Sequence, residues 1–139
     1  MVRRKRIRIV LDTNIWISFL IGKRLSILSD LILADKVQVL FSEQIVEEIT
    51  MVTKRPKIRK YFQEEKTIEF LAFLDIIGEK IEISTEVNQC RDPKDNFLIS
   101  LAIDGKANYL ITGDDDLLEL KKIGRIKIVN FSQFEEGVK

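Results

Sequence analysis

Short runs of branched apolar residues alternate along the chain with longer segments whose apolar residues recur every three or four positions. The short runs predict strands that are buried on both faces, because such strands are apolar at nearly every position. The longer segments predict amphipathic helices. This alternation is typical of an α/β domain whose mostly parallel sheet has helices on both faces. The expected strands cover residues 6–11, 37–41, 108–112 and 126–130, with a short extended piece at 80–85.

Residues that favour helix ends set the bounds of the expected helices. Asn14 is suited to cap a first helix that Gly22 ends, and Ser42 is suited to cap the helix after the second strand. Pro93 fits the first turn of a later helix that Gly105 ends. We expect helices over residues 13–22, 26–35, 43–55, 56–77 (as one or two helices), 93–104 and 114–124, and a terminal helical turn or two at 131–138.

Composition restricts the chemistry that the chain can perform. Its 139 residues fit one domain, and a hydrophobic fraction of 45% is enough for a core. There is no histidine and a single cysteine, Cys90. A Ser–His–Asp triad, a histidine base and a zinc site with several cysteines are therefore excluded. Any reaction must rest on carboxylates, hydroxyls, lysines or a bound cofactor.

Charge and hydropathy also bear on location and partners. The formal net charge is +1, so any attraction to nucleic acid must be local. The longest apolar stretch, around residues 15–21, is too short to span a bilayer, and we expect no membrane partner. The lack of cysteine pairs suits a reducing cytoplasm, where we expect the protein to reside.

Carboxylates follow the expected strands. Asp12 comes directly after the first strand, and Asp114 and Asp116 follow the strand at 108–112. Asp95 opens a helix, and Glu48 lies in the helix after the second strand. Because the carboxyl ends of parallel strands meet at one edge of a sheet, these acids are expected to converge there. An oxygen-rich cluster of this kind suits Mg²⁺ or Mn²⁺.

Each acid also has a purely structural explanation. Asp92 is a good N-cap residue, with Pro93 in the first helical turn. The acids at 114–116 stabilise the positive end of a helix dipole. Asp12, which ends an apolar strand, is the acid for which a structural role explains least, although it is placed to cap the helix that follows. Glu48 lies in a helix whose outer face must be charged. The joint placement of acids from four segments, more than any single residue, favours a metal site.

Four stretches of the sequence match the motifs of one protein family. They are "VLDTN" after the first strand, the pair Ser42 and Glu48, the apolar run that follows Asp95, and "YLITGDDDLL". In this order and spacing they resemble the PIN-domain nucleases. The likeness is closest to stand-alone prokaryotic proteins described as toxins of toxin–antitoxin pairs, which share "DPKDN". The resemblance implies a single PIN-like domain over residues 1–139, an α/β/α sandwich with a central, mostly parallel sheet of four to five short strands.

The resemblance also implies a function and a site. The function is hydrolysis of RNA phosphodiester bonds with one or two Mg²⁺ or Mn²⁺ ions, and the partners are a small antitoxin protein and a second copy of the chain. The implied catalytic, metal-binding acids are Asp12, Glu48, Asp95 and Asp114. Further candidates for metal binding are Asp92 and Asp116, and the supporting polar residues are Asn14, Thr112 and Ser42.

An RNA substrate held near an acidic site requires positive charge nearby. One candidate cluster precedes and enters the first strand, namely Arg3, Arg4, Lys5, Arg6 and Arg8. A second cluster is followed by Tyr61 and Phe62, whose rings are suited to stack on bases. The alternative for the second cluster is a solvated helix face with both rings in the core. The RNA-binding residues expected from it are Lys54, Arg55, Lys57, Arg59 and Lys60.

Three other classes of protein fit parts of this pattern. A phospho-acceptor receiver domain needs an acidic pair at the first strand and a lysine after a later strand, and this chain has a single Asp there and no suitable lysine. A haloacid-dehalogenase-like phosphatase needs D-x-D where this chain has "DTN". A catalytically inactive PIN-fold module that binds RNA or another protein remains the main alternative, although the four intact acids favour a nuclease.

Overall fold

A central sheet organises the structure, a computed structural model that describes residues 6–22, 25–88 and 90–138. Within these residues the sheet has six strands in the order β3-β2-β1-β4-β6-β5. All neighbouring pairs are parallel except β5 and β6. The strands are β1 (Ile7–Leu11), β2 (Val37–Phe41), β3 (Glu79–Lys80), β4 (Tyr109–Ile111), β5 (Lys122–Ile123) and β6 (Ile126–Val129).

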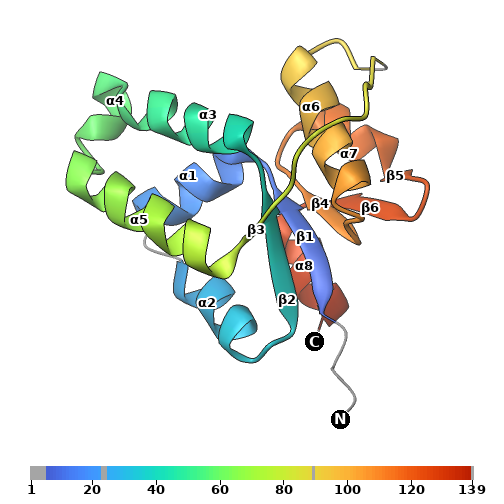
Figure 1. The fold of residues 1–139 in the computed structure, drawn as a ribbon, viewed down its shortest axis with the longest axis horizontal. Coiled ribbons are helices and arrows are strands. Elements are labelled where there is room, and N and C mark those ends of the chain that lie inside the picture. Colours follow the sequence, from blue (N-terminus) through green and yellow to red (C-terminus); the bar gives the residue numbers. More distant parts are fainter. Residues whose placement is uncertain (1–5, 23–24, 89, 139) are drawn as a thin grey trace.

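The expected fold class, an α/β sandwich with a mostly parallel sheet, is confirmed. The sheet has more strands than the expected four to five because each edge adds a strand of two residues. In Figure 1, α1, α3 and α5 lie on one side of β1 and β2, and α6 and α7 lie on the other. The helices are α1 (Thr13–Gly22), α2 (Leu25–Leu33), α3 (Glu43–Thr53), α4 (Pro56–Arg59), α5 (Glu64–Ile77), α6 (Pro93–Asp104), α7 (Asp115–Leu120) and α8 (Phe131–Val138).

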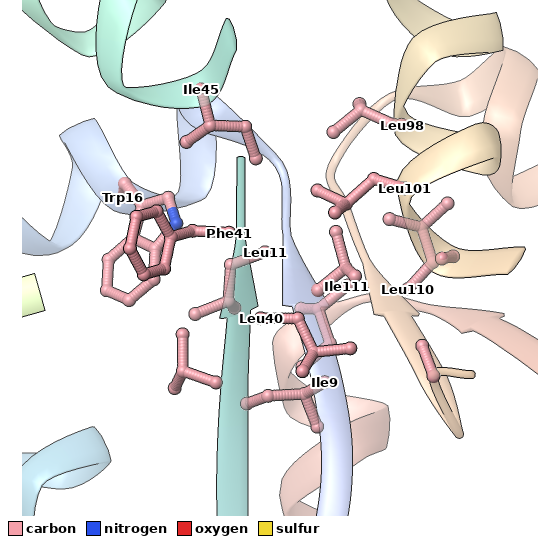
Figure 2. Close-up of a cluster of buried hydrophobic side chains, with 14 of the residues drawn as sticks. Ile9, Leu11, Trp16, Leu40, Phe41, Ile45, Leu98, Leu101, Leu110 and Ile111 are labelled. Atoms are coloured by element: carbon pink, nitrogen blue, oxygen red, sulfur yellow. The ribbon is translucent and has the colours of Figure 1, made fainter. Parts of the chain in front are cut away.

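The core lies where the central strands meet the helices on both sides. Ile9 and Leu11 of β1 and Leu40 of β2 are fully buried, as the unbroken apolar runs require. Figure 2 shows Ile45 of α3 and Leu98 of α6 approaching these strands from opposite sides. Burying an aliphatic side chain of this size contributes roughly 1.5–3 kcal/mol. This packing fixes the ends of β1 and β4, which carry the acids.

Local hydrogen bonds confirm one expected cap and correct another. Ser42 Oγ accepts the Ile45 N–H at 3.4 Å and caps α3, as expected. Of the two candidate caps for α1, Asn14 and Asp12, the prediction for Asn14 is wrong. Asp12 acts instead, because its Oδ1 accepts the Asn14 N–H at 3.2 Å and its carbonyl accepts the Ile15 N–H at 2.9 Å.

The helix expected to run to Gly124 ends earlier, at Leu120. Lys121 adopts φ 63°, which stops the helix, and its N–H donates to Leu118 O. The chain then forms a hairpin in which Ile123 pairs with Ile126 across Gly124, whose φ is 57°. Glycine adopts this conformation readily, so its sequence signal marks the turn of the hairpin and not the end of the helix.

No helix in the described ranges is long and apolar enough to cross a membrane.

Candidate active site

Thr112 joins two of the candidate acids at the carboxyl edge of the sheet. Leu11 of β1 pairs with Ile111 of β4, so the residues that follow these strands lie side by side. The Thr112 hydroxyl donates to Asp12 Oδ2 at 2.8 Å and accepts the Asp114 N–H at 3.0 Å. Because Thr112 is fully buried, this link is shielded from water. The threonine thus holds Asp12 and the start of the Asp114 loop in a fixed relation.

Asp12 is a buried carboxylate in the field of other acids. Only 8% of the residue is exposed. Burial raises its pKa above the ordinary value, the hydrogen bonds from Thr112 and from the Asn14 N–H oppose this shift, and the charges of Glu48 and Asp114 add to it. Glu48 on α3 and Asp114 after β4 are therefore near enough to Asp12 to act on its charge. Three segments distant in sequence converge at this edge.

Asp95 brings a fourth segment to the same place. It lies in the first turn of α6, is 5% exposed, and its carboxylate accepts no hydrogen bond from any described residue. Burial raises its pKa to about 6, and the charges of Asp114, Asp92, Asp12 and Asp116 contribute in that order. Little of the residue reaches solvent, no described group donates to its carboxylate, and several acids surround it, which makes Asp95 the strongest functional candidate of the set.

Besides Asp12, which caps α1, two further acids have the expected structural role as helix caps. Asp92 caps α6 by accepting the Lys94 N–H at 3.0 Å, and Asp114 caps α7 by accepting the Asp116 N–H at 2.8 Å. Each cap uses one carboxylate oxygen, so a second oxygen of each residue is left for another partner. Asp95 caps nothing, and its position has no comparable structural explanation.

Two cations that the sequence analysis passed over accompany the acids. Lys94 Nζ lies 3.5 Å from Glu48 Oε1, and an Arg91 guanidinium nitrogen lies 3.5 Å from Asp116 Oδ1. Both cations are exposed, so these pairs stabilise the fold little. Their signal was present in "RDPKD", where each cation directly precedes a candidate acid. They supply positive charge at the rim of the acidic edge.

Asn96 is another residue that the motifs did not single out. Its amide accepts the Cys90 N–H at 2.8 Å and donates to the Cys90 carbonyl at 3.1 Å. This pair of bonds ties the segment before α6 to the helix. It therefore fixes the approach of Arg91 and Asp92 to the acidic edge.

The donor set suits a hard divalent cation, but the side chains do not surround a common point. All candidate ligands are carboxylate oxygens, which Mg²⁺ and Mn²⁺ prefer. Across the ranges that the structure describes, no three acidic or thiol side chains stand close enough to hold one ion. Glu48 is directed to Lys94 and Asp116 to Arg91. Side-chain rotation would be needed to bring these oxygens onto an ion.

The described part of the first basic cluster, Arg6 and Arg8, does not lie at the acids. Arg3, Arg4 and Lys5 fall outside the described residues. Arg6 and Arg8 stand near the amino end of β1, whereas Asp12 follows its carboxyl end. Arg6 pairs with Asp35 and Arg8 with Glu79, so this part of the cluster is occupied in ion pairs with neighbouring strands and loops. Because Arg6 and Arg8 lie at one end of β1 and Asp12 follows the other end, they lie toward opposite edges of the sheet.

The second basic cluster lies around α4 and combines features of both explanations. Tyr61 is 65% exposed, whereas Phe62 is partly buried and packs against the core. Arg59 lies 3.7 Å from Glu64. The cations of the cluster, Lys54, Arg55, Lys57, Arg59 and Lys60, therefore follow α3, the helix that carries Glu48, with one exposed ring beside them.

Comparison with known proteins defines the class. The family model described as PIN domain matches residues 8–116, and the chain belongs to this family, whose members are generally nucleases that typically use divalent metal ions. The chain is 36% identical over 132 residues to "Uncharacterized protein MJ1680" of Methanocaldococcus jannaschii, a match that covers 90% of this chain and 82% of that one.

A solved structure shares the fold. It is the "Crystal structure of VapBC2 from Rickettsia felis bound to a DNA fragment from their promoter". The TM-score is 0.61 at 22% sequence identity, and the match covers 90% of this chain and 99% of that chain. This similarity supports the PIN fold and the sheet topology described above.

Proposed function

We propose that this protein is a metal-dependent endoribonuclease that hydrolyses RNA phosphodiester bonds, in a single domain over residues 1–139. One observation carries the proposal. Asp95 is buried, has no hydrogen-bond donor among the described residues, and lies close enough to Asp114, Asp92, Asp12 and Asp116 for their charges to raise its pKa. The fold therefore holds acids from separate segments together against their electrostatic repulsion. A divalent cation is the simplest ligand that relieves this repulsion.

Roles for the acids follow from their surroundings. Asp12, Asp95 and Asp114 are the residues that would hold the ion, and Glu48 would hold a second ion or orient water. Asp92 and Asp116 are further candidates, since each has a carboxylate oxygen at the same edge. A bound Mg²⁺ or Mn²⁺ supplies charge against the phosphate and lowers the pKa of a water molecule.

The polar neighbours position these acids. Thr112 fixes Asp12 through its hydroxyl, and the Asn14 N–H donates to the other oxygen of the same carboxylate. Ser42 caps α3 and so sets the start of the helix that carries Glu48. These hydrogen bonds hold the acids in place before substrate arrives, which lowers the reorganisation that the reaction requires.

The RNA is held by cations around the acids. Lys94 and Arg91 are the nearest, because their charged groups already lie at Glu48 and Asp116. The α4 cluster, Lys54, Arg55, Lys57, Arg59 and Lys60, extends the positive surface beyond α3, with Tyr61 available for stacking.

A toxin role in a toxin–antitoxin pair is the biological setting that we propose. The motifs resemble those of stand-alone prokaryotic PIN toxins, and the VapBC2 structure from Rickettsia felis shares the fold. In this setting the chain acts in the cytoplasm, forms a homodimer and is blocked by a small antitoxin protein.

The test is RNA cleavage with Mg²⁺ or Mn²⁺ by the wild-type chain and by Asp12→Asn. We expect the substitution to reduce cleavage by about 100-fold or more, because it removes a charged ligand. Asp115→Asn is the control, since Asp115 is an acid at the same edge of the sheet, at the start of α7, and we assign it no role. The product should carry a 5′ phosphate, since water is the nucleophile. A 2′,3′-cyclic phosphate, or full activity of Asp12→Asn, would overturn the mechanism.

The second candidate is an inactive PIN-fold module that binds RNA or a protein. The lack of three carboxylates at ligating distance in the described chain favours it. Thermal unfolding with and without Mn²⁺ separates the two, because an ion that binds the folded state raises the melting temperature. RNA binding with neither cleavage nor a shift by Mn²⁺ would establish the module.

A further inference from the structure

A basic pocket lies at the edge of the sheet opposite to the acids. It has a volume of about 390 Å³, in the lower part of the range of ligand pockets. It is found where β1, β4 and β6 begin, while Asp12 and Thr112 follow the other ends of β1 and β4. Five residue steps along β1, at roughly 3.3 Å each, separate the two edges by roughly 16 Å. Its lining consists of Arg6, Ile7, Asn108, Tyr109, Arg125 and Lys127.

The pocket offers hydrogen-bond donors and positive charge. Arg125 and Lys127 are exposed, and neither forms an ion pair with a described residue. Arg6 is partly committed, since its Nε pairs with Asp35 and another guanidinium nitrogen donates to Gln38. No acid is among the described residues that line the pocket. A ligand that satisfies such a lining must be rich in acceptors and negatively charged.

The amide of Asn108 adds a donor in a fixed orientation. Its Oδ1 accepts the Arg8 N–H at 2.8 Å, which directs the oxygen to the strand and leaves the NH₂ group as the free end. The Asn108 N–H donates to Arg8 O at 2.7 Å, and the Asn108 carbonyl accepts the Lys127 N–H at 3.0 Å. The backbone under the pocket is thus held by hydrogen bonds to the neighbouring strands on both sides.

An aromatic ring stands beside the cations. Tyr109 and Lys127 are cross-strand partners, and Lys127 Nζ lies 6.0 Å from the centroid of the tyrosine ring. Phe134 of α8 packs against the same ring at 5.3 Å, nearly edge to face, and fixes its orientation. A ring joined to cations and an amide is the combination with which proteins bind single-stranded nucleic acid.

We infer that this pocket is a second binding site for the phosphodiester backbone of single-stranded RNA, remote from the acids that cleave it. The identity of the nucleic acid rests on the proposed function. The pocket would hold a part of the RNA that is distant from the cleaved bond. It would thereby raise affinity for long RNA without contacting the reacting phosphate.

The test compares RNA binding by the wild-type chain and by Arg125→Gln/Lys127→Gln, with fluorescence anisotropy in EDTA so that cleavage does not interfere. We expect the double variant to bind an RNA of about twenty nucleotides roughly tenfold more weakly. The slope of log K against log salt should fall by about 1.4, since each phosphate contact to a single strand contributes about 0.7. Lys66→Gln, which removes a cation of the separate cavity beside α5, should leave both quantities unchanged.

A charge-preserving swap guards against a folding defect. Arg125→Lys/Lys127→Arg should retain RNA affinity, because both side chains are exposed and keep their charge. Unchanged affinity and slope in the double Gln variant would overturn the inference. Poly-glutamate serves as a probe for acidic proteins. If the double Gln variant lost binding to poly-glutamate but kept its RNA binding, the pocket would belong to an acidic protein partner and the inference would be overturned.

Cleavage in Mn²⁺, measured in parallel, separates this inference from the proposed function. If the wild-type chain binds RNA without cleaving it, the proposed nuclease function is contradicted. The comparison of RNA affinity between wild type and the double Gln variant still tests the pocket. A wild-type chain that binds no RNA contradicts both.

Discussion

The Thr112 hydroxyl donates a hydrogen bond to Asp12 Oδ2 at 2.8 Å, although one hundred positions separate the two residues in the sequence. The same hydroxyl accepts the Asp114 N–H at 3.0 Å, so one side chain determines the relative placement of two candidate ligands. The parallel pairing of β1 with β4 makes this possible, since it aligns the ends of the two strands. The candidate site is therefore a product of the sheet register.

Thr112→Val tests this link. Valine keeps the shape of threonine but leaves Asp12 Oδ2 without its donor, which costs about 1–3 kcal/mol of stability in a buried setting. We expect affinity for Mn²⁺ to fall about 10-fold to 100-fold, as for other residues that orient a ligand. Calorimetric titration with Mn²⁺ measures this, and Thr112→Ser should restore it because the hydroxyl is retained. Equal Mn²⁺ affinity in Thr112→Val and wild type would show that the link has no role in the site.

The raised pKa of Asp95 predicts how stability depends on pH when no metal is added. The folded protein holds the Asp95 proton up to about pH 6, whereas the unfolded chain releases it near 3.8. Between these values the folded state binds more protons, so this residue makes stability fall as pH rises. The destabilisation is absent well below pH 3.8, reaches its full size well above pH 6, and is on the order of 3 kcal/mol.

Asp95→Asn isolates this contribution. Glu79 and Asp104 have lowered pKa values, because they accept hydrogen bonds from Arg8 and Thr85 respectively, and they act in the opposite direction. Both are present in the variant and in the wild type, so their effects cancel in the comparison. Urea unfolding in EDTA should show the variant to be more stable than wild type at pH 7, with the difference lost near pH 4. A difference independent of pH would contradict the assigned cause.

Lys94 is expected to contact RNA. Its ammonium lies 3.5 Å from Glu48 Oε1, at the rim of the acidic edge. Lys94→Gln should raise KM for RNA severalfold with a smaller effect on kcat, because a charge that binds the substrate is lost while the acids remain. Lys94→Arg should stay close to wild type. Steady-state kinetics decide the matter, and a loss confined to kcat would place Lys94 in the chemical step.

The α4 cluster makes a separate prediction about affinity. Lys54→Glu/Arg55→Glu should weaken RNA binding and reduce its dependence on salt, because fewer counterions are released per RNA bound. Anisotropy titrations over a range of salt concentrations measure both quantities, with Lys66→Glu as the control for charge reversal on an exposed helix. If the slope of log K against log salt were the same for the variant and the wild type, this cluster would not contact the RNA.

The periodicity of apolar residues was sufficient for most of the fold. It placed β2 at 37–41 and α6 at 93–104, with bounds that the structure reproduces. It failed where local signals compete, as at Gly124, whose turn signal fits both a helix stop and a hairpin. Strand pairing decided that case, since Ile123 gains a partner in Ile126 that a continued helix would not provide.

The sequence by itself determined the fold class, the family motifs and the kind of donor available, because these follow from the order and chemistry of residues along the chain. Only the tertiary structure decided which charges meet. It buried Asp95 without a donor, placed Lys94 beside Glu48, and sent Arg6 and Arg8 to the edge away from Asp12. The reason is geometric. Distances across the sheet depend on strand order and register, and the local sequence around a residue specifies neither.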